Sequence, residues 1–472
     1  MHWRLIAAFA AGLALERVEA KRPDGFDAGF LASRHEDAHG DVRLKMIGPF
    51  FEVAQSTQGW RLVAVRPFYS SLEDPTGGRE REDFLWPLAT RREIGSEESS
   101  RYLVFFHFKH GPEKPDRRYR FWLLPFYFEG RDASGIHYRA VFPLGGTIRE
   151  FLGRDEIRFV LFPIRSTSRL NDLRTSNWLW PLISETEGQG VHRARVFPLY
   201  GRSVREGAYD KLFVLWPFYT QVRYEYPGSR GSGFILFPLY GHIKLEDQET
   251  WWLIPPFFRY TRGEKMNRVY MPWPFIQRDT GETERLVVWP LYGYRKYEGN
   301  QRVFIAWPIV WHERNQRGTE QREAWMVVPF YFHSVTAEAG APPRKRYVKF
   351  WPFFSYRRDG NASKFRMLEL WPLADNGAVE RNWAPLWTLY SSVRVGENVD
   401  RELLWGFHRD HRRGAAERLW TLFPVWEWHR SSAGASWELL EGLLGRERTN
   451  SGARWRVLYF WGFEAESEDS QP

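Results

Sequence analysis

The sequence predicts an all-β repeat protein, and three observations carry this prediction. An aromatic-Pro-apolar-aromatic motif returns about every nineteen residues, as in residues 197–200 (FPLY) and 216–219 (WPFY). Runs of β-branched and aromatic residues precede the motif, and such runs favour strands. Short Gly- and Asp-containing segments, such as residues 279–281 (DTG) and 298–300 (EGN), separate the motifs and are typical of turns. We therefore expect tandem repeats in an antiparallel meander.

The proline marks the repeats along the chain. A copy without proline fills the gap after Pro87, and Gly406 and Gly462 stand in for proline near the C-terminus. The series gives about 22–23 repeats, and a fixed period of this kind indicates a repeat architecture. Its prolines are Pro49, Pro67, Pro87, Pro125, Pro143, Pro163, Pro181, Pro198, Pro217, Pro238, Pro256, Pro274, Pro290, Pro308, Pro329, Pro352, Pro372, Pro385 and Pro424.

The proline also constrains each strand. It donates no hydrogen bond, so within a sheet it is confined to edges, strand ends or bulges. With about ten strand residues in each repeat, either one strand is bent at the proline, or it ends there and a second short strand follows. About 22 strands are expected. Aligned side by side, the rings beside the prolines would form an aromatic girdle, represented by Trp180, Phe197, Tyr200, Trp216, Tyr219, Phe237, Tyr240, Trp289, Tyr292, Trp307, Trp351 and Trp371.

Both faces of the predicted sheet are apolar close to the proline. The positions four and two before it are mostly Leu, Val, Ile or Phe, and its immediate neighbours are aromatic or apolar. The third position before it carries a charge in some repeats, as at Arg195, Lys349 and Glu369. A sheet in water has one wet face. The pattern therefore indicates apolar contacts on both sides at the level of the prolines.

Composition limits the chemistry. The chain has 472 residues, 25 Trp, a net charge of +9 and no Cys. Without Cys there is no disulfide framework, thiolate metal site or cysteine nucleophile. The 67 Lys and Arg are interleaved with 58 Asp and Glu, which favours a solvated surface with internal ion pairs over a dedicated anion site. We expect no nucleic-acid partner.

The N-terminus predicts export. Residues 1–20 show a short basic start, eleven apolar residues (5–15) and small residues before Lys21, the pattern of a signal peptide. A polar segment over residues 21–42, one continuous β-repeat domain over 43–463 and an acidic tail over 464–472 would follow. The expected location is the outer membrane or periplasm of a Gram-negative-type bacterium.

An export signal, strands of about ten residues and charged turns together resemble the outer-membrane barrel class. The resemblance implies a closed up-and-down barrel, which we expect in preference to an open curved sheet or solenoid because closure removes sheet edges. The chain departs from that class in three respects. Its connections are uniformly short, nearly every repeat carries proline, and the chain ends on an acidic tail rather than an aromatic strand.

Residues 35–39 (HEDAH) match the H-E-x-x-H string, which on a helix places two histidines on one face to bind zinc beside a glutamate that activates water. A short helix over residues 28–39, with Asp27 as N-cap, would present His35, Glu36 and His39 in this way. The weaker zinc hypothesis stands against an exposed polar segment, which the local composition favours. The pair His408 and His411 is likewise expected at the surface, since histidines three apart on a strand point to different faces.

The predicted function is therefore non-catalytic and needs no cofactor. The leading prediction is an outer-membrane-type barrel with a structural or transport role for an apolar or amphipathic ligand. The alternative is a soluble periplasmic or surface scaffold whose aromatic residues bind glycan or lipid. A zinc-dependent hydrolase using His35, Glu36 and His39 is a remote third. The expected partners are membrane lipid, or a lipid-like or glycan ligand.

Overall fold

The structure, a computed structural model, describes residues 26–74, 78–95, 97–103, 106–110, 119–449 and 452–465. The predicted signal peptide and most of the predicted acidic tail lie outside these residues. The described chain is 63% strand and 4% helix, in an antiparallel meander of many strands. The predicted all-β class and meander are therefore confirmed.

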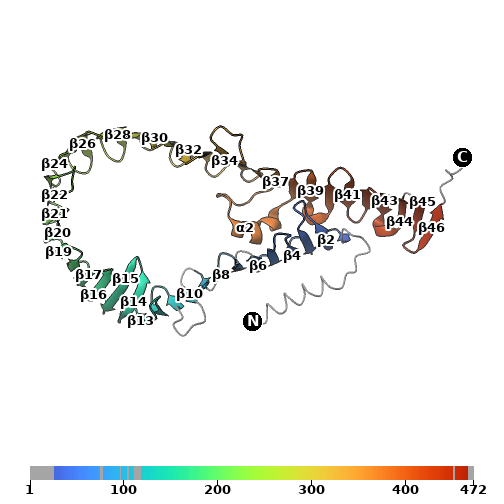
Figure 1. Cartoon of the computed structure of the whole chain (residues 1–472), viewed down its shortest axis with the longest axis horizontal. Coiled ribbons are helices and arrows are strands. Elements are labelled where there is room, and N and C mark those ends of the chain that lie inside the picture. Colours follow the sequence, from blue (N-terminus) through green and yellow to red (C-terminus); the bar gives the residue numbers. More distant parts are fainter. Residues whose placement is uncertain are drawn as a thin grey trace. The chain divides into compact units, whose positions relative to one another are not determined.

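By internal contacts the chain divides into unit 1, residues 1–95 with 319–472, and unit 2, residues 96–318. The strands of unit 2 follow one another in chain order (Figure 1). They are β9 (Glu97–Tyr102), β10 (Phe106–His110), β11 (Tyr119–Leu123), β12 (Tyr127–Arg131), β13 (His137–Val141), β14 (Gly145–Phe151), β15 (Arg154–Val160), β16 (Arg165–Leu170), β17 (Leu173–Trp178), β18 (Ile183–Gly188), β19 (Val191–Val196), β20 (Tyr200–Arg205), β21 (Tyr209–Val214), β22 (Tyr219–Tyr224), β23 (Gly231–Leu236), β24 (Tyr240–Leu245), β25 (Gln248–Leu253), β26 (Phe258–Gly263), β27 (Met266–Tyr270), β28 (Ile276–Gly281), β29 (Thr283–Val288), β30 (Tyr292–Tyr297), β31 (Asn300–Ile305) and β32 (Val310–Arg317).

Unit 1 combines the N-terminal strands with the C-terminal third of the chain. Its strands are β1 (Phe26–Ala28), β2 (Ala32–Glu36), β3 (Val42–Met46), β4 (Phe51–Gln55), β5 (Arg61–Val65), β6 (Tyr69–Asp74), β7 (Arg79–Phe84), β8 (Ala89–Ile94), β33 (Glu320–Val327), β34 (Tyr331–Glu338), β35 (Lys345–Phe350), β36 (Phe354–Asp359), β37 (Ala362–Met367), β38 (Tyr390–Val395), β39 (Asn398–Leu403), β40 (His408–Arg413), β41 (Glu417–Leu422), β42 (Trp426–Ser431), β43 (Gly434–Leu439), β44 (Leu444–Thr449), β45 (Gly452–Val457) and β46 (Trp461–Ala465). Two short helices, α2 (Gly377–Asn382) and α3 (Ala384–Trp387), separate β37 from β38.

Each repeat forms a hairpin of two strands. Of the two alternatives for the proline, the second holds, because the strand ends at the aromatic-proline turn and a new strand follows. In one repeat, β21 ends at Val214, residues 215–218 make the turn and β22 begins at Tyr219. The expected number of about 22 strands is wrong for this reason, since the described residues form 46. Six-residue strands span about 20 Å.

The two ends of the strands carry different turns. In unit 2 we call the row of aromatic-proline turns the proline edge; it comprises residues 124–126, 142–144, 161–164, 179–182, 197–199, 215–218, 237–239, 254–257, 271–275, 289–291 and 306–309. The other ends of the strands meet in polar turns such as residues 206–208 (EGA) and 298–299 (EG), which form the polar edge. Successive turns alternate between the edges because consecutive strands are antiparallel.

Closure of the sheet is not confirmed. Among the described strands, the pairings of known register all join neighbours in the chain, from β1 with β2 to β45 with β46. The described part of the sheet therefore establishes a meander and not a barrel.

In unit 1, the N-terminal strands β2–β4 lie against the C-terminal strands β39 and β40, with α2 beside β6 (Figure 1). Phe30 stacks on Phe407 with ring centroids 4.7 Å apart. The Arg381 side chain in α2 donates to Asp83 at 2.8 Å, and the Trp383 indole donates to the Trp86 carbonyl at 2.9 Å. These contacts join residues 297 to 377 positions apart in the chain.

The helices correct the repeat series. Pro372 lies in the irregular segment before α2, and Pro385 is the second residue of α3, so neither marks a separate hairpin. Asn376 starts α2 by accepting from the Ala378 backbone N–H at 2.9 Å, and proline suits the first turn of a helix because its missing donor would have no partner there. The segment is an insertion within a single turn between β37 and β38, which pair directly.

Several repeats place glycine under an aromatic ring. Gly201 pairs with Phe213, Gly241 with Trp252 and Gly293 with Phe304 on the neighbouring strands. A Cβ on Gly293 would lie 2.0 Å from the Phe304 ring, and its three nearest atoms all belong to that ring. The Tyr-Gly dipeptide after each of these turns therefore leaves room for an aromatic partner.

We predict that Gly293→Ala destabilises the chain by about 1–3 kcal/mol, because the added methyl group displaces the Phe304 ring. Urea unfolding measures the effect. The Gly293→Ala/Phe304→Leu double variant should lose less stability than the two single changes combined. Gly377→Ala is the control, since its Cβ would meet only the Arg381 Nη1 atom, at 3.5 Å. Simple additivity in the double variant would contradict the packing argument.

Candidate functional site

At the proline edge of unit 2, the backbone N–H groups of the turns donate to carbonyls of the same edge. In the turn at residues 215–218, Leu215 N–H donates to the Leu199 carbonyl at 2.7 Å and Trp216 N–H to the Pro198 carbonyl at 2.7 Å. Phe218 N–H closes the turn onto the Leu215 carbonyl at 2.8 Å. The remaining residue is Pro217, which has no N–H. Every backbone donor of this turn is therefore used, either within the turn or on the preceding one.

The same pattern repeats along the edge. In the turn at residues 161–164 the first two N–H groups donate to the carbonyls of residues 144 and 143, and in the turn at 306–309 to those of 291 and 290, all at 2.7–2.8 Å. Consecutive proline turns are thus hydrogen-bonded to one another, and the edge is continuous secondary structure rather than a row of independent loops.

The first residue of each four-residue turn has left-handed backbone geometry, and in four of the five turns it carries a large side chain, the fifth being Ala306 with a φ angle of 49°. The φ angle is 43° at Leu161, 48° at Leu179, 46° at Leu215 and 47° at Ile254. For a residue with a Cβ this conformation costs about 1–2 kcal/mol. The same side chains are 46–53% exposed. In water, therefore, about half of each side chain remains exposed while its backbone carries this strain.

The predicted aromatic girdle belongs to the edge of the sheet. Its Trp and Phe members in unit 2 precede the turn proline, and its Tyr members open the following strand. Trp180, Trp216 and Trp307 are 46–51% exposed. Trp289, Tyr200, Tyr240 and Tyr292 are also exposed, whereas Phe197, Tyr219 and Phe237 are half-buried. In unit 1, Trp351 occupies the equivalent turn position, but Trp371 lies in the inserted segment.

The rings before proline contact one another from repeat to repeat. Phe162 lies between Phe142 and Trp180, with centroid separations of 5.4 and 5.7 Å. Trp289 likewise contacts Phe275 at 5.6 Å and Trp307 at 5.9 Å. Tilted and edge contacts at these distances are favourable for aromatic pairs. The rings form ladders that help to fix the spacing of the turns.

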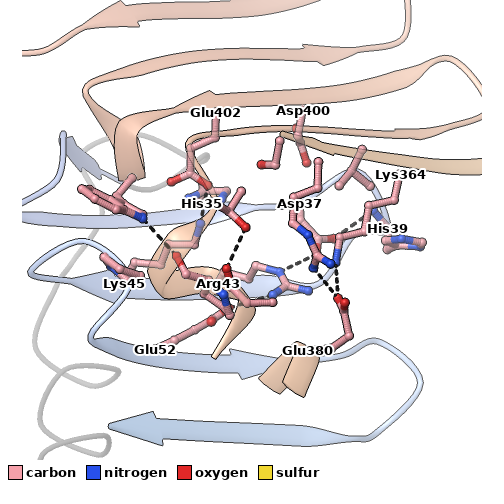
Figure 2. Close-up of a pocket in the computed structure, with 18 of the residues that line it drawn as sticks. His35, Asp37, His39, Arg43, Lys45, Glu52, Lys364, Glu380, Asp400 and Glu402 are labelled. Carbon is pink, nitrogen blue, oxygen red and sulfur yellow. Dashed lines mark hydrogen bonds and ion pairs between the residues drawn. The ribbon is translucent and has the colours of Figure 1, made fainter. Parts of the chain in front are cut away.

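Unit 1 contains a second candidate, a cavity of about 410 Å³ between its N-terminal and C-terminal strands. Figure 2 shows its labelled charged side chains, with His35, Arg43, Lys45 and Glu52 coming from β2–β4 and Glu402 from β39. Pro49, Ala384, Pro385, Leu389 and Trp405 line another part of the same cavity.

The charges around the cavity are mostly paired. Arg43 donates to Asp37 at 2.6 Å and to Glu52 at 2.7 Å, and Arg66 donates to Glu52 at 2.5 Å. Although burial opposes ionisation, Arg66 and Arg43 hold the pKa of Glu52 well below its usual range. A buried charge that lost its partner would be strongly destabilising, so these pairs fix how the strands meet.

Two further ion pairs join the N-terminal and C-terminal segments of unit 1, and the first of them lines the cavity. Lys45 donates to Glu402, and the buried Arg409 donates to Asp27. Burial acts to raise the pKa of Glu402, but Lys45 and Arg409 lower it to about 2. Both pairs connect residues more than 350 positions apart.

The H-E-x-x-H string does not form the predicted helix. His35 and Glu36 end strand β2, and Asp37 begins a tight turn in which its side chain accepts from the backbone N–H of His39 at 2.8 Å and of Asp41 at 3.1 Å. Aspartate favours such turns because its carboxylate can satisfy the free N–H groups. Glu36 and His39 are exposed, and His35 and His39 both line the cavity. The zinc hypothesis requires both histidines on one face of a helix, and the structure has no helix there.

His35 meets a histidine from the other end of the chain. Its ring centroid lies 4.8 Å from that of His411, which is 8% exposed, so the expectation of a surface position for His411 is wrong. Asp400 accepts from His411 Nδ1 at 2.7 Å. Burial, and then the nearby His411, Arg409, Lys45 and Arg43, lower the pKa of His35 well below its usual value.

Three carboxylates beside the inserted helices also converge, and one of them, Glu380, lines the cavity. Oxygen atoms of Glu369, Asp375 and Glu380 lie within 4.8 Å of one another. Arg366 donates to Glu369 and Glu380, and Arg357 donates to Asp375. Arginine side chains therefore neutralise these carboxylates. Because Glu380 belongs to α2, the same ion pairs hold the inserted helices in place.

Sequence reasoning did not identify the cavity, because its two walls come from opposite ends of the chain. A local signal did exist, since Asp400 and Glu402 alternate on β39 as Arg409 and His411 do on β40. Side chains two apart share one face of a strand. Charges at that spacing, on strands with apolar neighbours, indicate a polar face covered by another layer.

The chain matches no protein-family model and no curated protein. Within the described part of the chain, neither helix has the length and apolar character that crossing a membrane would require.

We predict that unit 1 loses stability as the pH falls below about 6.5, the ordinary histidine pKa. Below that pH the unfolded chain binds a proton at His35, whereas the folded chain does not, because folding lowers the pKa of His35. Proton binding therefore favours the unfolded state. Between pH 7.5 and 5.5 the His35→Gln variant should lose about 1 kcal/mol less in urea unfolding than the parent. The exposed His39→Gln is the matched control. An identical pH slope in the His35→Gln variant would refute the assignment.

Proposed function

We propose that this protein is a non-catalytic, exported β-repeat scaffold that binds lipid by inserting its proline edge into the surface of a membrane. The observation that carries the proposal is the use of leucine and isoleucine at the first turn position. These residues are unfavourable there both for their left-handed backbone and for their exposure in water. A membrane-binding role explains why large apolar side chains occupy positions that glycine would fill with less strain.

The hydrogen bonding of the turns supports the same proposal. Unpaired backbone N–H groups are costly in lipid, which excludes most loops from the hydrocarbon region. The turns at residues 161–164, 215–218 and 306–309 have no unpaired donor, because two N–H groups bond to the preceding turn, one closes its own turn and the fourth residue is proline. Such turns can enter an apolar phase without leaving a backbone donor unpaired.

The sheet of unit 2 forms a narrow ribbon whose two edges, the proline edge and the polar edge, differ in composition. About 20 Å separates the proline edge from the polar edge, whose turns contain Glu, Gly, Asn and Asp. Tryptophan and tyrosine at the proline edge suit the boundary between acyl chains and headgroups. A ribbon of this kind binds edge-on, with its polar turns in water and its apolar turns about 5–10 Å deep.

The outer-membrane-type barrel remains a second proposal, and the apolar residues on both faces beside the turns favour it. Strand length favours the scaffold instead. A strand that crosses a bilayer needs about 9–11 residues, whereas the strands of unit 2 have five to eight. A transport role for an apolar or amphipathic ligand belongs to this second proposal.

We predict that the exported protein sediments with membranes and is released by carbonate or urea washes, because an inserted edge holds it less firmly than a spanning barrel would. Immunoblots of the washed pellet and supernatant measure the distribution. Release only by detergent would establish the barrel in its place. Recovery in the soluble fraction before any wash would contradict both membrane proposals.

We also predict that the triple variant Leu179→Gly, Leu215→Gly, Ile254→Gly binds vesicles about 100-fold more weakly without losing stability. Each half-exposed side chain contributes about 1 kcal/mol on insertion, while glycine relieves backbone strain. Flotation with vesicles measures binding, and urea unfolding measures stability.

The matched control replaces polar residues of the same backbone geometry at the polar edge. Asn171, Gln189 and Glu298 have φ angles of 51°, 52° and 45°, so Asn171→Gly, Gln189→Gly, Glu298→Gly relieves similar strain without removing apolar surface. This control should bind vesicles like the parent. Equal binding by both triple variants would overturn the proposed function.

A further inference from the structure

The net charge of the protein resides in unit 2. Residues 96–318 contain 33 Lys and Arg against 24 Asp and Glu, which gives +9, the net charge of the whole chain. The remaining residues contain 34 of each sign. Both units contain residues of both signs, but the whole excess of positive charge lies in unit 2. The unit with the extended proline edge is the cationic one.

Within unit 2 the positive charge is concentrated beside the proline edge. On the described strands β11–β32, the three positions nearest that edge hold eight arginines and only two carboxylates, Glu129 and Glu185. Five of the eight arginines are exposed, and we call them the arginine row: Arg139, Arg158, Arg165, Arg202 and Arg278. They lie within about 10 Å of the turns along the strands.

Part of the arginine row has no acidic partner. Arg158 bonds to Glu156 at 2.6 Å and Arg202 to Asp210 at 2.7 Å. Among the described residues, Arg165 and Arg278 form no recorded ion pair, and neither does Arg139, which lies over the Tyr127 ring, 5.5 Å from its centroid, and opposite Glu129 on the next strand. A guanidinium that forms no ion pair within the protein is suited to bidentate contacts with phosphate.

We propose that the membrane surface bound by the proline edge is anionic, and that the arginine row contacts lipid phosphates just above the inserted turns. This inference rests on the proposed function. When the apolar turns lie among the acyl chains, arginines one to three strand residues from the turns lie at the level of the lipid headgroups. There each cation strengthens attachment to an anionic leaflet. The order of side chains along each strand thus matches the order of layers in a lipid surface.

The test compares vesicles of phosphatidylcholine alone with vesicles containing phosphatidylglycerol, using the full chain. The parent should bind the anionic vesicles at least about 100-fold more tightly at low salt, and the difference should shrink as salt rises. The Arg139→Gln, Arg165→Gln, Arg278→Gln triple variant should lose about 100-fold on anionic vesicles and little on neutral ones.

The control removes three arginines near the polar edge, Arg230→Gln, Arg262→Gln, Arg317→Gln. In 0.15 M salt these lie more than a Debye length of about 8 Å from the inserted turns, so binding measured there should stay within about threefold of the parent. Equal binding of the parent to neutral and anionic vesicles would overturn the anionic inference and leave the proposed function standing. Binding to neither vesicle would overturn both. Capture by a soluble acidic polysaccharide, with no vesicle binding, would assign the arginine row to a glycan.

Discussion

The structure of unit 2 depends on the hydrogen bonds that join each aromatic-proline turn to the one before it. A turn exposed at the end of a hairpin normally relies on water for some of its backbone groups. Here the donors of residues such as Leu215 and Trp216 reach the carbonyls of the preceding turn. The turns therefore form their own ladder, parallel to the ladder of strand pairs, and the spacing of the aromatic rings follows from it.

This ladder explains the composition of the motif. Proline removes the one N–H that no carbonyl of the ladder accepts, and the ring before it packs on the ring of the next repeat. Leucine or isoleucine at the first position is the exception, since neither the backbone nor water favours it. In the proposed membrane-bound state the same side chain is buried in acyl chains, and its presence has a physical reason.

Much of the fold could be predicted from periodicity, because strands, turns and repeats are local properties. The strand count could not, since a proline at a bulge and a proline at a turn leave the same pattern in sequence. The sequence pattern predicts an aromatic girdle at one level of the sheet, and the hairpin geometry places it at the edge. The contact of His35 with His411 was beyond local reasoning, because it depends on two strand groups meeting from opposite ends of the chain. The helix expected over residues 28–39 failed because Asp37 bonds the turn that follows β2.

The two units divide two physical tasks between them. Unit 1 buries matched charges such as Arg409 with Asp27 and joins the ends of the chain, whereas unit 2 leaves apolar and cationic groups open. Because each hairpin adds two strands, one more repeat would lengthen the ribbon by about 10 Å and add one further turn. Attachment through many weak, evenly spaced points grows steeply with their number. The number of repeats therefore sets two properties together. Insertion or loss of whole hairpins changes the length of the sheet and the time for which the protein stays bound to a membrane.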